Sequence, residues 1–148
     1  MTNTVSVLND LIETSKDGEQ GFLKAAEDAT DPELKTLFAS RADGCARAVR
    51  ELQERVVQLG GKPEHHGSVS GALHRGWVDV KSALSTRDNH AILAECERGE
   101  DVAKKRYRDA LDKDLPADIR AVVELQFQGV IQNHDRVRDL RDQYAAMK

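Results

Sequence analysis

The stretch GGKPEHHGSVSGALHRGWVDVKSALST, residues 60–86, separates two pairs of long segments with helical periodicity. It begins as a loop rich in Gly, Pro and His, and Ser70 can then cap a shorter helix, because serine oxygens accept bonds from the first helical N–H groups. The apolar edge of that helix consists of Leu73, Trp77, Val80 and Leu84. A connection of this length can run the full height of a bundle. It therefore predicts an up-down-down-up order of helices with one long crossover.

Outside this connection, apolar residues recur at three- and four-residue steps in four stretches, which is typical of one buried helix face. The first covers about residues 5–29. The second covers about residues 32–59, with Asp31 as its predicted cap and a glycine pair at its end. The third begins near residue 87, and the last follows Pro116. The sequence thus predicts an all-α four-helix bundle with a short helix in the crossover between its second and third long helices.

The composition is that of one helical domain, residues 1–148. Charged residues make up 32% and aromatic residues only 4%, which argues against a β-sandwich. A net charge of -4 argues against a nucleic-acid partner, and no apolar run approaches the roughly 20 residues of a membrane span. The first ten residues lack the basic and apolar regions of a signal peptide. We therefore expect a cytoplasmic protein with neither nucleic-acid nor membrane partners.

Several polar residues fall at positions that the helical periodicity predicts to face the core. The predicted polar layer consists of Glu19, Arg41, Glu100, Gln126 and His134. The helical rise places Glu19, Arg41, Glu100 and His134 within about 8 Å of one another along the bundle axis. A buried carboxylate needs a cation or strong hydrogen-bond donors, because an unpaired buried charge is costly. The central question is therefore which cation this layer holds.

Glycines lie near the same level. Gly18, Gly44, Gly99 and Gly129 each fall near the middle of a different long helix. A glycine inside a helix costs about 1 kcal/mol relative to alanine. Four such costs at one height indicate a local packing reason; the alternative is that they are unrelated surface glycines.

Three segments carry a family resemblance. They are LNDLIET at residues 8–14 followed by Asp17-Gly18, GALHRGW at residues 71–77, and ERGED at residues 97–101. With these motifs the chain resembles a bacterial family of uncharacterised ferritin-like four-helix-bundle proteins, classed as a domain of unknown function. The resemblance covers nearly the whole chain. It implies a ferritin-like bundle and no established activity.

A di-iron site in a ferritin-like bundle draws one Glu from each of two helices and a Glu-x-x-His pair from each of the others. Glu19 and Glu100 fit the first requirement, but the chain contains no Glu-x-x-His. Arg41 is a permanent cation and a donor only, so it can replace a metal as partner but cannot bind one. We therefore favour a metal-free core in which Arg41 pairs with Glu19 or Glu100, while Gln126 and His134 complete the hydrogen bonds.

Two further interpretations of the polar layer stay open. In the first, Glu19, Glu100 and His134 hold iron or manganese in a mononuclear or otherwise atypical site. In the second, these residues point outward or into an oligomer interface. Two functions correspond to these interpretations of the polar layer. The first is a non-catalytic bundle without a cofactor, which is stress- or storage-associated and acts through self-association or a partner. The second is a metal-dependent oxidoreductase or metal-storage protein. The missing Glu-x-x-His pairs favour the first function and a protein that is not an enzyme.

Other candidates concern the surface and the cysteines. His74, Arg75 and Trp77 on the crossover could form a partner-binding edge, but the favoured interpretation is that Trp77 packs over the bundle as a core anchor with His74 and Arg75 at its rim. Cys45 and Cys96 are expected to be buried free thiols, since a disulfide needs Cα atoms within about 7 Å. Two stretches that mix charges of both signs are predicted to be solvated helix faces. They are residues 101–108 and 135–142.

Overall fold

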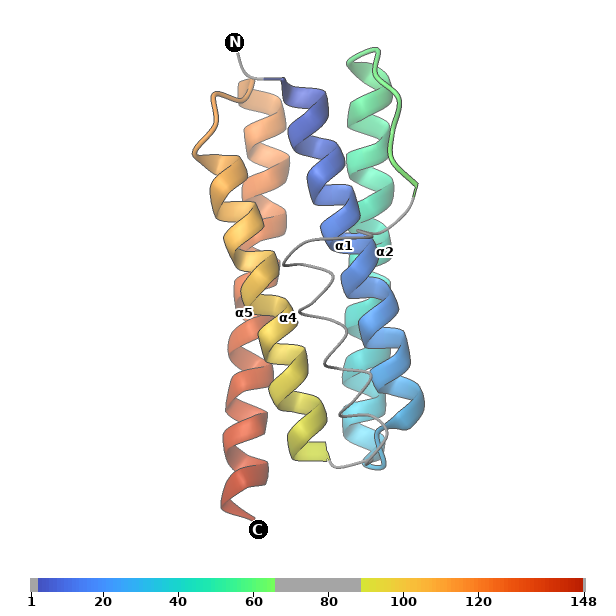
Figure 1. The fold of residues 1–148 in the computed structure, drawn as a ribbon, viewed down its shortest axis with the longest axis vertical. Coiled ribbons are helices and arrows are strands. Elements are labelled where there is room, and N and C mark those ends of the chain that lie inside the picture. Colours follow the sequence, from blue (N-terminus) through green and yellow to red (C-terminus); the bar gives the residue numbers. More distant parts are fainter. Residues whose placement is uncertain (1–2, 66–88, 148) are drawn as a thin grey trace.

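The computed structural model describes residues 3–65 and 89–147. Every regular element within them is an α-helix, and together they form a four-helix bundle (Figure 1). The helices are α1 (Thr4–Asp28), α2 (Pro32–Gln58), α4 (Asn89–Leu111) and α5 (Ala117–Ala146). None of these described helices is both long and apolar enough to cross a membrane. The predicted crossover helix, with His74, Arg75 and Trp77, lies outside the described residues.

Local sequence signals set the ends of α2. The Asp31 side chain accepts a bond from the Glu33 backbone N–H at 2.9 Å, and Pro32 occupies the first turn. These features confirm the predicted start of the helix. At the other end, Gly60 has a φ of 81°, which turns the chain out of the helix. The helical periodicity predicts that Leu59 faces inward, yet it is 41% exposed. That prediction was wrong because the helix ends one residue earlier, at Gln58.

The four helices pack as two hairpins. α1 packs along α2 and α4 along α5, while α1 faces α4 and α2 barely touches α5. At one end of the bundle, the Thr30 N–H donates to Asn89 Oδ1 at 3.2 Å and the Tyr144 hydroxyl donates to Asp31. Figure 1 shows the start of α1, the end of α2, the end of α4 and the start of α5 together at the opposite end.

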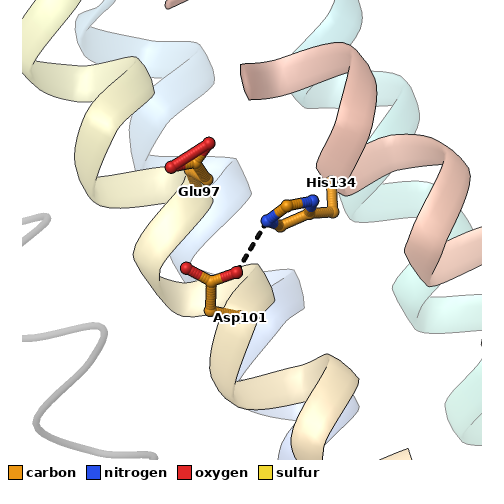
Figure 2. Close-up of side chains that lie close together, drawn as sticks. All are labelled: Glu97, Asp101 and His134. Atoms are coloured by element: carbon orange, nitrogen blue, oxygen red, sulfur yellow. Dashed lines mark ion pairs between the residues drawn. The ribbon is translucent and has the colours of Figure 1, made fainter. Parts of the chain in front are cut away.

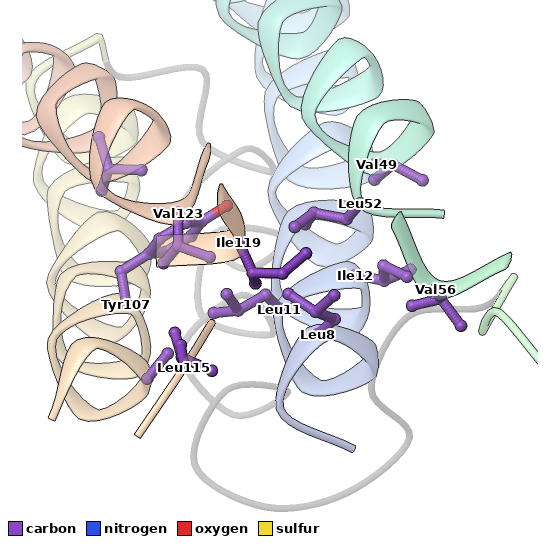
Figure 3. Packing of buried hydrophobic residues seen from close by; sticks show 12 residues of the cluster. Leu8, Leu11, Ile12, Val49, Leu52, Val56, Tyr107, Leu115, Ile119 and Val123 are labelled. Carbon is purple, nitrogen blue, oxygen red and sulfur yellow. The ribbon is translucent and has the colours of Figure 1, made fainter. Parts of the chain in front are cut away.

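Two apolar clusters fill the bundle, one toward each end. The cluster near the α1–α2 loop includes the stacked rings of Phe22 and Phe38, whose centroids are 6.0 Å apart. The other cluster is shown in Figure 3 and includes Leu8, Ile12, Leu52, Val56, Ile119 and Val123. Buried polar residues lie between the two clusters. Burial of the apolar side chains supplies most of the driving force for folding, and the polar residues between the clusters form the candidate site.

Candidate functional site

An ion pair between α2 and α4 lies at the centre of the bundle. Arg41 Nε donates to Glu100 Oε1 at 3.0 Å. The Glu100 side chain is 2% exposed and that of Arg41 is 17% exposed. The Arg41 guanidinium also lies 6.0 Å from the Phe22 ring centroid, within the range of a cation–π contact. The carboxylate therefore has a fixed cationic partner on the neighbouring hairpin.

A third side chain joins this pair from α5. Asn133 Nδ2 donates to Glu100 Oε1 at 2.9 Å. The other carboxylate oxygen, Glu100 Oε2, is buried and has no hydrogen-bond partner among the residues that the structure describes. Asn133 directly precedes His134, which the helical periodicity had selected for this role. The periodic pattern found the correct turn of α5 but not the residue that reaches Glu100.

Electrostatics keep the Arg41 guanidinium charged. Burial by itself would lower the pKa of Arg41, but the attraction and hydrogen bond of the Glu100 carboxylate, together with the nearby Cys45 and Tyr107, outweigh this effect, so the pKa lies above its usual value. Burial raises the pKa of the neighbouring Cys45 thiol to about 12, and burial likewise raises that of Cys96. Both cysteines are buried and free, as predicted. Their thiols are protonated at neutral pH and therefore poor nucleophiles.

Gln126 belongs to a separate hydrogen-bond network beside the ion pair. The Tyr107 hydroxyl donates to Gln126 Oε1 at 2.9 Å and lies 3.2 Å from Ser15 Oγ. Because the Tyr107 proton is directed to Gln126, Ser15 is the donor in the second contact. Burial raises the pKa of Tyr107 above its usual value. This network ties α1, α4 and α5 together through neutral groups.

Glu19 lies at the edge of the polar layer. Its side chain is 22% exposed and accepts a bond from Lys16, on the same helix, at 3.4 Å. Of the two carboxylates proposed to pair with Arg41, it is thus Glu100 that does so in the structure.

His134 is buried but faces aspartates rather than Glu100. Its Nε2 lies 2.6 Å from Asp101 Oδ1 and its Nδ1 lies 3.0 Å from Asp135 Oδ1. The bond to His134 lowers the pKa of Asp135 below its usual value. Asp101 and Asp135 belong to stretches predicted to be solvated; both are partly exposed, yet each also contacts the buried imidazole.

The alternative iron or manganese site requires Glu19, Glu100 and His134 to converge on one ion. In the structure, Glu19 pairs with Lys16, Glu100 with Arg41 and His134 with Asp101. The ligand atoms of Glu19, Glu100 and His134 do not come together in the part of the chain that the structure describes. The donor set that the sequence suggested does not fit a shared metal.

A cavity lies beside the polar layer, between α2 and α5, which are the neighbouring helices that pack together least. Its volume is about 410 Å³, and its polar lining includes Arg41, Glu100, Tyr107 and Gln126. Gly44 and Gly129 line it from opposite helices. This volume lies within the range of small-molecule pockets, about 300 to 1,000 Å³.

The central glycines do not all serve one purpose. A methyl group at Gly18 would come within 3.2 Å of Cys45 Sγ, so a packing reason holds at this position. A methyl group at Gly129 would meet nothing within 4 Å. The predicted shared packing reason therefore applies to Gly18 but not to Gly129, which borders the cavity.

The family model described as "Domain of unknown function (DUF2383)" matches residues 3–113. The chain belongs to this family. A search of curated proteins finds no match to the chain. The DUF2383 match includes Arg41 and Glu100, whereas Asn133 and His134 lie beyond its end. The description of the DUF2383 family assigns no activity, so the function must be inferred from the geometry.

Proposed function

We propose that this DUF2383 protein is a non-catalytic, ferritin-like bundle whose centre is held by an ion pair in place of a metal. The observation that carries this proposal is the 3.0 Å contact between Arg41 Nε and the buried Glu100 carboxylate. The guanidinium supplies the positive charge that the carboxylate needs. It is also a donor only, so it cannot serve as a metal ligand.

The ferritin-like, up-down-down-up topology is the finer part of the proposal. It is supported by the two contacts that bring the start of α4 and the end of α5 to the α1–α2 loop, from Asn89 to Thr30 and from Tyr144 to Asp31. At the opposite end, Arg55 near the end of α2 lies 3.9 Å from Asp118 near the start of α5. One long crossover between α2 and α4 accommodates these neighbours.

We infer that the protein acts by binding, in the cytoplasm. The cavity between α2 and α5 supports a binding role, because it combines apolar walls with convergent polar groups from Arg41, Tyr107 and Gln126. The free thiols of Cys45 and Cys96 support a reducing compartment, where disulfides are rare. We extend the same proposal to a stress-associated role for the protein and to self-association of the bundle.

The experiment is oxygen consumption after ferrous iron is added to the full-length protein. We expect the wild type to consume oxygen no faster than iron in buffer alone. The matched variant is Glu100→Gln, which keeps the shape of the side chain but removes its charge, and it should give the same rate. Iron-dependent oxygen consumption by the wild type that disappears in Glu100→Gln would overturn the proposal.

A further inference from the structure

The geometry points to a divalent-metal site between α4 and α5, formed by Glu97, Asp101 and His134. One ligand atom from each residue lies within 4.8 Å of the other two (Figure 2). Glu97 and Asp101 are four residues apart on α4, so their side chains share one face of that helix. His134 reaches toward them from α5. The site shares no residue with the Arg41–Glu100 pair.

The imidazole of His134 is oriented as in many metal sites. Its side chain is 8% exposed, and Nδ1 lies 3.0 Å from Asp135 Oδ1. A carboxylate at one ring nitrogen holds the N–H there and leaves the lone pair of the other nitrogen free for a metal. In His134 that other nitrogen is Nε2, which faces α4.

The contact between His134 and Asp101 brings a ligand nitrogen of α5 and a ligand oxygen of α4 together. His134 Nε2 lies 2.6 Å from Asp101 Oδ1, which is the spacing of a short hydrogen bond or close ion pair. An ion bound by both atoms would replace this hydrogen bond, and the two atoms would move apart to about 3 Å, because each would lie about 2.1 Å from the ion. A proton makes a simple salt bridge, and a metal makes the site proposed here.

Glu97 favours the metal. Its Oε1 accepts a bond from Arg141, while its Oε2 is buried without a hydrogen-bond partner among the described residues. A buried acceptor left unsatisfied costs free energy. An ion held by His134 and Asp101 would give Glu97 Oε2 a partner.

The donor set indicates the class of metal. One imidazole nitrogen and two carboxylate oxygens suit zinc and the other first-row divalent ions better than magnesium, which prefers oxygen ligands alone. Ligand atoms about 2.1 Å from one ion are at most about 4.2 Å apart, so the observed spread closes with a shift of less than about 1 Å. Asp101 is 57% exposed, which leaves the remaining coordination positions accessible to water.

The experiment is a calorimetric titration of the chelator-treated, full-length protein with zinc chloride. We expect one zinc ion to bind per chain. Asp101→Asn and His134→Gln should each weaken binding by at least about tenfold, since even loss of a residue that supports a ligand costs 10- to 100-fold. The matched control is Asp109→Asn, which removes the same charge from an exposed position on α4. It should bind zinc like the wild type.

Zinc uptake that persists in both ligand variants would overturn the inference, and so would a wild type that binds no zinc, as a plain salt bridge predicts. Asp101 is exposed enough that its variant should fold, and circular dichroism checks this for both variants. Failure here is distinct from failure of the proposed function. The proposed function fails if iron-driven oxygen consumption depends on Glu100. The metal-site inference fails if zinc binding does not depend on His134.

Discussion

Arg41 on α2 donates to Glu100 on α4 at 3.0 Å, so a cation of one helical hairpin neutralises a buried carboxylate of the other. Asn133 on α5 shares the same carboxylate oxygen. Three of the four described helices thus meet at one oxygen atom in the middle of the bundle. The pair links the two hairpins in one arrangement, whereas apolar packing alone would allow them to shift relative to each other.

The buried thiols predict a loss of stability in alkali. Burial raises the pKa of Cys45 from 9.0 to about 12 in the folded protein. Because the folded-state pKa is raised, the stability contributed by the protonated Cys45 thiol is complete below pH 9 and declines as the pH rises toward 12. Urea unfolding should therefore show a falling free energy of unfolding across this range.

The matched variant for this prediction is Cys45→Ala, which removes one ionisable thiol. Its stability should fall less steeply with pH than that of the wild type, although Cys96 and Tyr107 keep some slope. Equal slopes for the two proteins would show that Cys45 ionises equally in the folded and unfolded chains.

The contact between Tyr144 and Asp31 predicts an acid-side effect. The Tyr144 hydroxyl, followed by the Glu33 backbone N–H, lowers the pKa of Asp31 below 3.8. A lowered pKa stabilises the fold above pH 3.8, and this contribution is lost as the pH falls through the folded-state value. Tyr144→Phe should raise the pKa of Asp31 toward 3.8, as measured by NMR titration. Gln143→Ala, an exposed change on the same turn, should leave it where it is.

Two glycine substitutions should differ in effect. Gly129→Ala should stabilise the protein by about 1 kcal/mol, because the helix gains alanine's propensity and the new methyl group meets open space. Gly18→Ala should gain less or lose stability, since its methyl group would approach Cys45 Sγ at 3.2 Å. Thermal unfolding measures both. Equal gains would mean that Cys45 moves aside freely.

The coupling between Gly18 and Cys45 gives this comparison its control. In the Gly18→Ala/Cys45→Ala double variant the close contact is gone, so the combined loss should be smaller than the sum of the single effects. Simple additivity would argue that the 3.2 Å contact does not constrain the helices.

Local signals made part of this structure predictable. The Asp31 cap acts through its own side chain and the glycine after α2 through its own backbone φ, so both could be recognised without knowledge of the fold. The burial of Glu100 followed from helical periodicity alone. The Lys16–Glu19 pair is also local, at a spacing of three residues, and its spacing was a signal that could have separated Glu19 from the central layer.

The partners of the buried polar groups were harder to predict. Whether Asn133 or His134 reaches Glu100 depends on how α5 is rotated against α4, and periodicity defines that rotation only to within a residue. The same rotation places His134 against Asp101, a residue on a strongly charged helix face. The adjacent ERGED motif contains both Glu97 and Asp101, but nothing in the sequence connects it to His134.

The most direct test of the central ion pair is a double-mutant cycle on Arg41 and Glu100, measured by urea unfolding. Arg41→Met alone leaves a carboxylate that is 2% exposed without its cation, and should cost about 3–5 kcal/mol. Glu19→Ala, which removes only the partner of Lys16, should cost no more than about 0.5 kcal/mol. The Arg41→Met/Glu100→Met variant should recover to within about 1 kcal/mol of the wild type, because apolar residues of similar volume can replace a buried pair. Losses that simply add, or an Arg41→Met protein as stable as the wild type, would contradict the account.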